Sequence, residues 1–240
     1  MHTVKRAIVM AAGIGKRMQP VTLETPKPLI KVNGIRMIDS VIQGLNNNNI
    51  FEIYIVVGYM KEKFYSLEEE YPGVKVIENP FYNTCNNISS LYMARDHIED
   101  ALILDGDQII YNDSILQSEF ERSSYNCVWT DTDTDEWLLT VENGVVKSCS
   151  RSGGKGGWQL YSISRWTAQD GRKLKKHLEL EFELKKNQQI YWDDIALFCH
   201  PEDYHLGIQE MTRKDVTEID SIYELAQIDN HYKKYIHGGL

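Results

Sequence analysis

Short apolar runs alternate with helix-forming segments through the first hundred residues, and this alternation limits the possible folds most strongly. The runs that predict strands are RAIVMAA (6–12), EIYIVVG (52–58), VKVIEN (74–79) and ALILDGD (101–107). Helical spacing of apolar residues occurs between them, at 37–47, 61–71 and 88–98. We therefore expect an α/β fold in three α/β/α layers, with helices on both faces of a mixed, mostly parallel sheet.

The second half of the chain is rich in β structure. Asn143-Gly144 lies between apolar runs and predicts a hairpin. A long amphipathic helix is expected over 167–187, and TEIDS (217–221) predicts a short strand before a last helix capped by Ser221. SGGKGG (152–157) is either a plain hairpin connection or a mobile flap. No linker separates the halves, so we expect one domain, 1–240, with parts 1–124 and 125–240.

Composition narrows the class of protein. A formal net charge of −9 argues against a nucleic-acid surface, which needs a basic field. The cysteines are far apart and form no C-x-x-C pair, so neither zinc nor a disulfide framework is indicated. The apolar run AIVMAA is too short for a signal peptide or a membrane span. We expect a cytoplasmic protein without nucleic-acid or membrane partners; its oligomeric state stays open, a homodimer included.

Glycines and cations gather in AIVMAAGIGKRMQPVTLETPKPLI (7–30), directly after the first apolar run. A Walker-A loop needs Ser or Thr after its Gly-Lys pair, but Arg17 follows Gly15 and Lys16, which excludes that motif. A dinucleotide fingerprint needs a third glycine that opens a helix. Position 18 is Met and Pro20 interferes with a helix there, so this motif is disfavoured.

A third phosphate-binding design uses the whole segment. Small residues let the backbone N–H groups approach a nucleotide: Ala11, Ala12, Gly13 and Gly15. Arg17 and Lys27 would supply charge to a triphosphate. The pattern A-A-G-x-G-x-R-x-x-P-x-T, followed by P-K-P-L, resembles the signature of nucleotidyltransferases that join a nucleoside triphosphate to a phosphorylated small molecule. The alternative is a plain glycine turn with solvated cations.

Two acidic segments suit the metal that such a reaction requires. Nucleotidyl transfer to a phosphate brings two anions together, and magnesium bridges them. Asp105 and Asp107 end an apolar run, and residues two apart on a strand point the same way. Glu218 and Asp220 alternate in the same manner. The resemblance implies a late acidic metal ligand beside Asp107; Asp220 matches better, Glu218 is the close alternative, and Asp220 as a helix cap is the plain interpretation.

Aromatic and acidic residues occur together in DEWLL (135–139) and IYWDDIAL (190–197). A quaternary ammonium group favours aromatic faces and a nearby carboxylate, because desolvated cation–π contacts are worth ~2 kcal/mol. A suitable set for such a group comprises Trp137, Tyr191, Trp192 and Asp193. The alternative is that the aromatic residues belong to the core and that Asp193 caps a helix.

The segments NNISSLY (86–92), DEW, YWDD and EIDS, in this order, are similar to bacterial CTP:phosphocholine cytidylyltransferases. This resemblance covers nearly the whole chain and implies a Rossmann-like nucleotidyltransferase fold, with a nucleotide-binding half (1–124) and a small β-rich acceptor-binding half (125–240). It implies Mg²⁺ as cofactor. It also implies that nucleotide contacts extend to Asn86, Asn87, Ser90 and Asp105, although the polar helix start at 86–90 could equally be a cap. Lys16 is expected to add its charge to the nucleotide-binding loop. Lys16 departs from the family pattern, and Asp194 adds an acid, so which aspartate faces the acceptor pocket stays open.

The expected reaction moves CMP from CTP to phosphocholine, or to a related cationic phospho- or phosphono-alcohol such as 2-aminoethylphosphonate, and releases pyrophosphate. Lys27, Arg17 and Asp107 are the expected catalytic residues. Two other functions stay open: a sugar-1-phosphate nucleotidyltransferase that uses UTP or dTTP, and a catalytically silent nucleotide-binding module. The acceptor that supports turnover would discriminate the first, and nucleotide binding without pyrophosphate release the second.

Overall fold

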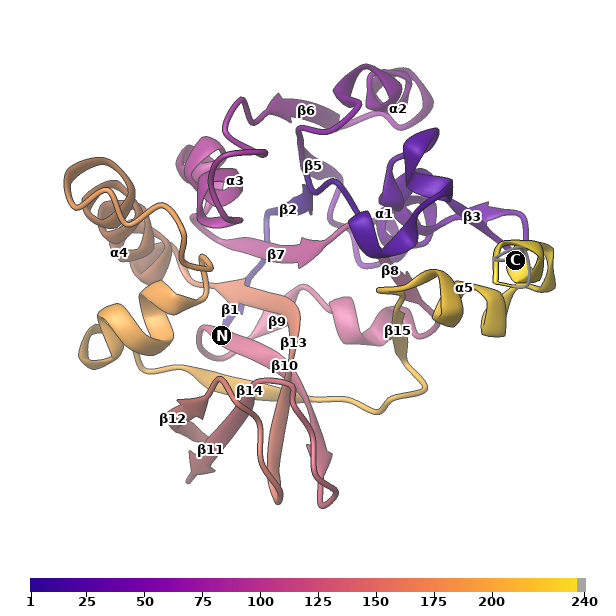
Figure 1. Ribbon diagram of the computed structural model, residues 1–240. Coiled ribbons are helices and arrows are strands. Elements are labelled where there is room, and N and C mark those ends of the chain that lie inside the picture. Colours follow the sequence, from indigo (N-terminus) through magenta and orange to yellow (C-terminus); the bar gives the residue numbers. More distant parts are fainter. Residues whose placement is uncertain (237–240) are drawn as a thin grey trace.

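Four parallel strands form one side of a nine-stranded mixed sheet in the computed structural model, which describes residues 1–236. In spatial order these strands are β7 (Ala101–Asp105), β2 (Arg6–Ala11), β5 (Glu52–Val57) and β6 (Val74–Glu78). Figure 1 shows them stacked from β6 at the top to β7 near the middle. The carboxyl ends of β2 and β7 therefore lie side by side, with Met10 opposite Asp105.

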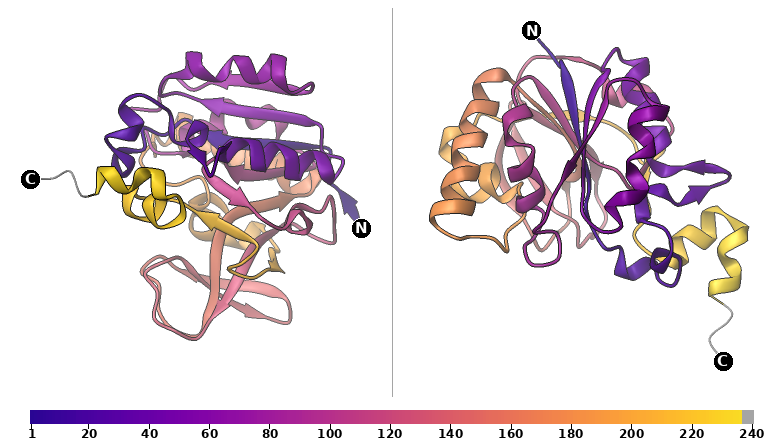
Figure 2. Two further views of the ribbon diagram at one scale, coloured as in Figure 1. Left: turned by 90° about the vertical axis from the view of Figure 1, so that its right-hand side faces the viewer. Right: turned by 90° about the horizontal axis from the view of Figure 1, so that it is seen from above.

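Helices cover both faces of this sheet, as the alternation predicts. Figure 2, in the view from above, shows α1 (Met37–Asn47) and α2 (Ser66–Glu70) on one side and α3 (Ile88–Met93) and α4 (Ala168–Leu178) on the other. Side chains of β2 alternate between the two cores, with Val9 facing the α1 side and Ile8 the α3 side. The expected α/β/α layers are confirmed.

Antiparallel strands extend the sheet through the second half of the chain. β13 (Gly157–Trp166) pairs with β7, β10 (Ser124–Thr130) and β11 (Leu138–Glu142), and β14 (Gly207–Glu210) runs parallel to β10. β11 and β12 (Val145–Ser150) form the hairpin expected at Asn143-Gly144, where both residues have positive φ. The segment 152–157 connects β12 to β13.

Short pairs of strands complete the fold around this sheet. These pairs are β1 (His2–Thr3) with β9 (Glu119–Phe120), β3 (Lys31–Val32) with β4 (Ile35–Arg36), and β8 (Gln108–Ile110) with β15 (Val216–Glu218). Ser221 caps α5 (Ile222–Ile228) as expected, through a reciprocal capping box with Glu224. No helix of the described part of the chain is long and apolar enough to cross a membrane.

Three helices are regular over a shorter range than predicted. The helix at 61–71 divides into a 3₁₀ turn and α2, which brings Phe64 and Leu67 into the core together. The helix at 88–98 stops at Met93, and a 3₁₀ turn follows in which His97 stacks on Tyr54. The helix at 167–187 is regular to Leu178 and then widens into a π-helix, Glu179–Leu184.

The last helix packs against the N-terminal loop, which follows β2. Ile219, Ile222 and Leu225 form one apolar cluster with Met18 and Ile30. Burial of about five such side chains is worth roughly 1.5–3 kcal/mol each relative to exposure. This cluster holds Asp220 opposite the glycine loop, although some two hundred residues separate them in the sequence.

Candidate active site

The N-terminal loop folds as a series of 3₁₀ turns between β2 and β3: Lys16–Met18, Val21–Leu23 and Lys27–Leu29. Gly15 has φ +66°, and a Cβ added there would lie 3.0 Å from Thr22 Cγ2 and 3.3 Å from Lys27 Cβ. The Thr22 hydroxyl donates a hydrogen bond to the Gly15 carbonyl oxygen, at 2.9 Å. Glycine is therefore required at position 15 both by the backbone conformation and by the space available.

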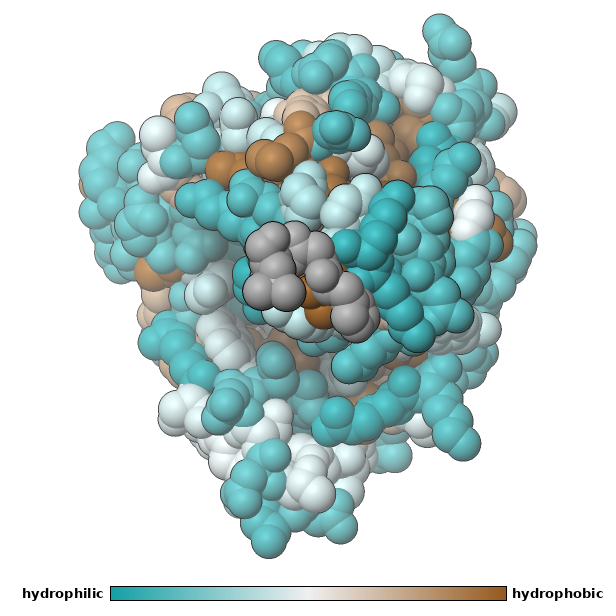
Figure 3. All heavy atoms as spheres, turned by 45° about the vertical axis from the view of Figure 1, so that its right-hand side comes forward, coloured by the Kyte–Doolittle hydropathy of each residue, from teal (hydrophilic) through white to brown (hydrophobic). Residues whose placement is uncertain are grey.

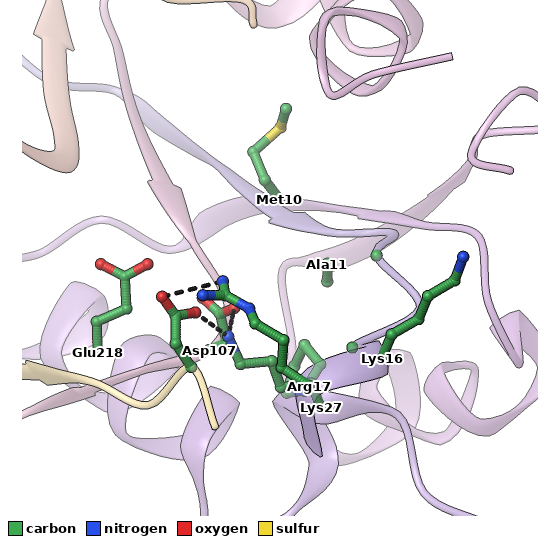
Figure 4. A pocket seen from close by; sticks show the side chains of 11 residues that line it. Met10, Ala11, Lys16, Arg17, Lys27, Asp107 and Glu218 are labelled. Atoms are coloured by element: carbon green, nitrogen blue, oxygen red, sulfur yellow. Dashed lines mark hydrogen bonds and ion pairs between the residues drawn. The ribbon is translucent and has the colours of Figure 1, made fainter. Parts of the chain in front are cut away.

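This loop forms one wall of a cavity of about 360 Å³. We call it the nucleotide cavity, after the ligand that the sequence predicts. The predicted nucleotide-binding and metal-binding residues that line the cavity are Ala11, Gly13, Gly15, Lys16, Arg17, Lys27, Asp107, Glu218 and Asp220. In Figure 4, Arg17 and Lys27 reach toward carboxylates, whereas the Lys16 side chain points away from them. Most of the predicted loop and acidic residues thus meet at one place.

Lys27 is the centre of an ion-pair network across this cavity. Its Nζ lies 2.5 Å from Asp107 Oδ2 and 2.8 Å from Asp220 Oδ1, and Arg17 Nη2 lies 3.1 Å from Asp220 Oδ2. Burial acts to lower the pKa of Lys27, but the charges of Asp107 and Asp220 outweigh it and raise that pKa. The ammonium group is therefore fixed as a cation at the mouth of the nucleotide cavity.

Three carboxylates form a cluster beside Lys27. Ligand atoms of Asp105, Asp107 and Glu218 lie within 4.8 Å of one another, and Asp107 Oδ1 is buried without a hydrogen-bond partner. Burial and the charge of Asp107 raise the pKa of Asp105 well above its usual value, and the same causes act on Glu218. An unpartnered buried oxygen among converging carboxylates fits a hard divalent cation such as Mg²⁺.

The cluster differs in two respects from the sequence prediction. β7 ends at Asp105, so Asp107 lies in the turn after the strand, and the expectation of two carboxylates on one strand is wrong. Gly106 occupies the tight position between them, where a Cβ would lie 3.1 Å from Val9 Cγ1. Asp220 pairs with Lys27 and Arg17, and Asp105 stands beside Asp107 and Glu218 in its place.

A second cavity of about 260 Å³ adjoins the carboxylate cluster. We call it the acceptor cavity, after the ligand that the sequence predicts. Its lining includes Trp137, Tyr191, Asp193 and Asn87, together with Asp105 and Glu218 from the cluster. The rings of Trp137 and Tyr191 meet edge to face, with centroids 5.7 Å apart. The predicted aromatic and acidic residues therefore share a cavity, which borders the carboxylate cluster.

Asp193 supplies an uncompensated carboxylate to this second cavity. The residue is buried, and its Oδ1 has no hydrogen-bond partner among the described residues. Burial raises the pKa of Asp193 to about 7; the nearby Tyr125 hydroxyl acts to lower this pKa, and the charge of Asp194 acts to raise it. A cation in the cavity would compensate this buried charge.

Asp194 and Trp192 have other roles. The Arg151 guanidinium donates to Asp194 Oδ1, and the Tyr191 backbone N–H donates to Asp194 Oδ2 at 2.8 Å. The open choice between the aspartates is thus resolved, since Asp193 faces the cavity. Trp192 is 2% exposed and packs between Tyr125 and Trp166. The prediction that its ring surrounds the acceptor is corrected, because the ring belongs to the core.

Asn86 and Asn87, directly before α3, hydrogen-bond to the segment 189–192. Asn87 Oδ1 accepts from the Trp192 backbone N–H at 2.9 Å, and Asn86 Nδ2 donates to the Gln189 carbonyl oxygen at 3.1 Å. Ser90 is buried and accepts from Asn79 Nδ2 at 3.0 Å. Of these residues, Asn87 lines the acceptor cavity, whereas Ser90 lies in an internal network and lines none of the site cavities.

A third cavity of about 340 Å³, the connecting cavity, lies between the other two and shares lining residues with both. It shares Asp220 with the nucleotide cavity, Glu136 with the acceptor cavity and Glu218 with both. Its lining includes Arg213, which sequence reasoning missed because no motif surrounds it. Glu136 was also missed, although it stands next to Trp137 in the quoted DEW. Figure 3 shows this side of the molecule, hollowed between the body above and the smaller lobe below.

A separate cluster of His177, His200 and Asp203 lies under α4, with ligand atoms within 4.8 Å of one another. The two imidazole rings stack in parallel, 9° apart with centroids at 3.9 Å. Lone pairs of parallel stacked rings run side by side and do not converge on one ion. His200 Nε2 also lies 2.9 Å from Glu181 Oε1. This geometry is that of a packing contact and not of a metal centre.

Relatives of known activity share nearly the full length of this chain. A 2-aminoethylphosphonate cytidylyltransferase from Lancefieldella rimae is 36% identical over 94% of this chain and 92% of that protein. A choline-phosphate cytidylyltransferase from Streptococcus pneumoniae is 29% identical over 95% of this chain and 98% of that protein. The solved structure of the CTP:phosphocholine cytidylyltransferase of S. pneumoniae matches with a TM-score of 0.88, 29% identity, and coverage of 95% of this chain and 99% of that chain.

The fold and the site define the class. The cations of the first loop and the carboxylate cluster meet beyond the carboxyl ends of parallel strands, where open α/β sheets bind their ligands. Residues 7–171 match the MobA-like NTP transferase domain. The chain belongs to this family and is a nucleotidyltransferase, which confirms the resemblance and the fold expected from its sequence.

Proposed function

We propose that the protein transfers CMP from CTP to a phosphonate or phosphate that carries an ammonium group, with release of pyrophosphate. The observation that supports this acceptor is Asp193, a buried carboxylate with an unpartnered oxygen beside Trp137 and Tyr191. The relatives named 2-aminoethylphosphonate and choline-phosphate cytidylyltransferases act on acceptors of this kind.

The composition of the acceptor cavity favours a primary ammonium group. Its lining contains two aromatic side chains, Trp137 and Tyr191, and two carboxylates outside the proposed metal ligands, Glu136 and Asp193. A primary ammonium donates three hydrogen bonds to such groups, whereas a trimethylammonium group donates none and relies on aromatic faces. With Trp192 in the core, one such face is lost. We therefore place 2-aminoethylphosphonate first and phosphocholine second.

The proposed chemistry is an in-line displacement at the α-phosphorus of CTP. An anionic oxygen of the acceptor forms the new P–O bond, the bond to the bridging oxygen breaks, and pyrophosphate leaves with that electron pair. The attacking oxygen is already deprotonated, so no side chain has to act as a general base. Catalysis consists of alignment and charge stabilisation. Mg²⁺ bound by Asp105, Asp107 and Glu218 would supply positive charge to the reacting phosphates.

Lys27 and Arg17 are the protein's own contribution to charge stabilisation. Lys27 Nζ forms ion pairs with Asp107 and Asp220. A triphosphate in the glycine loop would offer new partners to Lys27 and Arg17, within the same cavity. Preorganised cations at developing negative charge lower the barrier because they need no reorganisation during the reaction.

Sugar phosphates are the competing acceptor class. The inositol-1-phosphate CTP transferase of Thermotoga maritima shares the fold, with a TM-score of 0.78 at 18% identity. A sugar needs many hydroxyl partners, whereas this cavity offers mainly carboxylates and two aromatic rings. The cavity therefore supports a cationic acceptor better than a sugar.

The deciding experiment measures Mg²⁺-dependent pyrophosphate release from CTP, UTP and dTTP with each of four acceptors. These acceptors are 2-aminoethylphosphonate, phosphoethanolamine, phosphocholine and glucose-1-phosphate. We expect the highest kcat/KM with CTP and 2-aminoethylphosphonate. Best turnover with phosphocholine would retain the reaction and overturn the choice of head group. Turnover with glucose-1-phosphate alone would overturn the proposed acceptor class.

A further inference from the structure

Arg213 lines the connecting cavity, where it stands apart from the other cations of the site. Lys16, Arg17 and Lys27 line the nucleotide cavity, whereas no Lys or Arg other than Arg213 is among the described residues that line the connecting and acceptor cavities. The connecting cavity borders the metal-binding carboxylates through Glu218 and the acceptor cavity through Glu136. Arg213 is therefore placed between the two sites.

The guanidinium of Arg213 is held by a neutral partner. Its Nη2 donates to Gln159 Oε1 at 2.8 Å, and no carboxylate forms an ion pair with it among residues 1–236. Four carboxylates line the same cavity: Glu136, Glu218, Asp220 and Glu224. Glu224 accepts from the backbone N–H groups of Asp220 and Ser221 and is thereby occupied. Arg213 is exposed at the cavity wall, so solvent and not a carboxylate surrounds its charge, and several of its N–H donors are available to a ligand.

The segment that carries Arg213 is fixed on both sides. Asp215 Oδ2 accepts from the backbone N–H and the hydroxyl of Thr212, at 2.6 and 2.8 Å. Asn112 Nδ2 donates to Asp215 Oδ1 at 2.8 Å, which ties the segment to the end of β8. β15, which ends at Glu218, begins directly after it. The position of Arg213 relative to the carboxylate cluster is therefore set by local hydrogen bonds.

An acceptor of the proposed kind carries a phosphonate or phosphate that has to lie near the metal-binding carboxylates. Among the described residues that line the acceptor and connecting cavities, no other Lys or Arg is present to compensate that negative charge before the metal–nucleotide complex binds. We infer that Arg213 binds the phosphonate or phosphate oxygens of the acceptor and aims one of them at the α-phosphorus. Asp193 then holds the ammonium end and Arg213 the anionic end. This inference rests on the proposed function of the same site.

Two variants test the inference by different means. Arg213→Gln removes the guanidinium, and Gln159→Glu keeps it but places a carboxylate against it. Both should raise the KM for 2-aminoethylphosphonate by about 10- to 100-fold, the range for loss of charged hydrogen bonds, while the KM for CTP stays within about twofold. Arg213→Lys should recover part of the loss. Arg172→Gln, at an exposed ion pair with Glu99, is the matched control and should leave both constants unchanged.

Half-ligands separate the two ends of the acceptor. Ethylphosphonate carries the anion alone and ethylamine the cation alone, and both are tested as competitive inhibitors against 2-aminoethylphosphonate. Arg213→Gln should weaken inhibition by ethylphosphonate and leave inhibition by ethylamine unchanged; Asp193→Asn should do the reverse.

The outcomes distinguish this inference from the proposed function. If wild-type protein turns over no ammonium-bearing acceptor, the proposed function fails before any variant is made. If it does turn one over, and Arg213→Gln lowers only the melting temperature or raises both KM values alike, Arg213 is a structural residue and the inference is overturned.

Discussion

Lys27 forms two ion pairs in the site, because its Nζ lies 2.5 Å from Asp107 Oδ2 and 2.8 Å from Asp220 Oδ1. Two carboxylates would be costly so close together without it. The same group is the cation best placed to move to a triphosphate. Substitution of Lys27 therefore tests its proposed catalytic role, provided that folding is measured separately.

Lys27→Met should lower kcat/KM for CTP by at least about a hundredfold, because a preorganised charge at the reacting phosphates is lost. Steady-state pyrophosphate release measures this effect, and circular dichroism verifies that the variant is folded. Lys31→Met, at an exposed neighbouring lysine, is the control. Wild-type turnover in the Lys27 variant would refute its catalytic role.

The buried carboxyl group of Asp193 should make the KM for a cationic acceptor depend on pH. With a pKa of about 7, its carboxylate is neutral below that pH and ionised above it, and only the ionised form attracts an ammonium group. The KM for a cationic acceptor should therefore fall as the pH rises through 7. KM measured one pH unit on either side of 7 tests this, with buffers matched in ionic strength.

In Asp193→Asn the KM should be higher, and the part of the pH dependence that arises from this carboxylate should disappear. An unchanged pH profile in that variant would mean that another group controls acceptor binding. The KM for CTP should keep its wild-type pH dependence and serves as the internal control.

Among the elements, α5 positions the site from outside. Its capping box lies directly after Asp220, and its apolar face packs on the N-terminal loop. Ser221→Ala removes the cap and should lower the free energy of unfolding by about 1 kcal/mol. It should also raise the KM for CTP, because Asp220 loses its fixed position opposite Arg17 and Lys27.

Urea denaturation and steady-state kinetics measure the two effects of Ser221→Ala. Ser148→Ala, at an exposed position of β12, controls for the loss of a hydroxyl group. Full stability in Ser221→Ala would show that the apolar contacts of α5 alone define its start.

The elements also show what the sequence could predict. α1 has the predicted bounds, 37–47, because its apolar spacing is regular and its end falls in a run of asparagines. The hairpin at Asn143-Gly144 was predictable because both residues tolerate positive φ. The ends of the helices expected at 88–98 and 167–187 were not predictable. The stacking of His97 on Tyr54 determines the first, and the hydrogen bonds of the buried Glu181 determine the second.

The site was predictable to a similar degree. Motif residues of the glycine loop lie where their pattern indicates, because each acts through its own backbone or its own charge. The positions of Trp192, Asp105 and Arg213 depend on which way a side chain turns after the chain has folded. Spacing along the sequence does not contain that information.

At the scale of the whole molecule, His177 joins α4 to the 3₁₀ turn at Pro201–Asp203. Its Nδ1 lies 2.8 Å from Tyr204 Oη, and its ring stacks on His200. Burial and the charge of His200 lower the pKa of His177, although the nearby acids Asp203, Glu181 and Glu202 act to raise it. The folded protein therefore binds this proton more weakly than the unfolded chain does.

It follows that the contribution of His177 to stability is complete above the pKa of the unfolded state, about 6.5, and decreases as the pH falls through it. His177→Gln should flatten the decline in the free energy of unfolding between pH 7 and pH 5, as measured by urea denaturation at several pH values. An equal decline in the variant and the wild type would assign the acid sensitivity to other groups.

Glu218 lines all three cavities, so one side chain borders the predicted nucleotide cavity, the predicted acceptor cavity and the connecting cavity. Whatever binds first changes the electrostatic environment that the second substrate meets. Thermodynamic reciprocity then requires that CTP alter the affinity for the acceptor by the same factor by which the acceptor alters the affinity for CTP. The two substrates of this enzyme would therefore bind as a coupled pair, with a single carboxylate as the shared boundary between them.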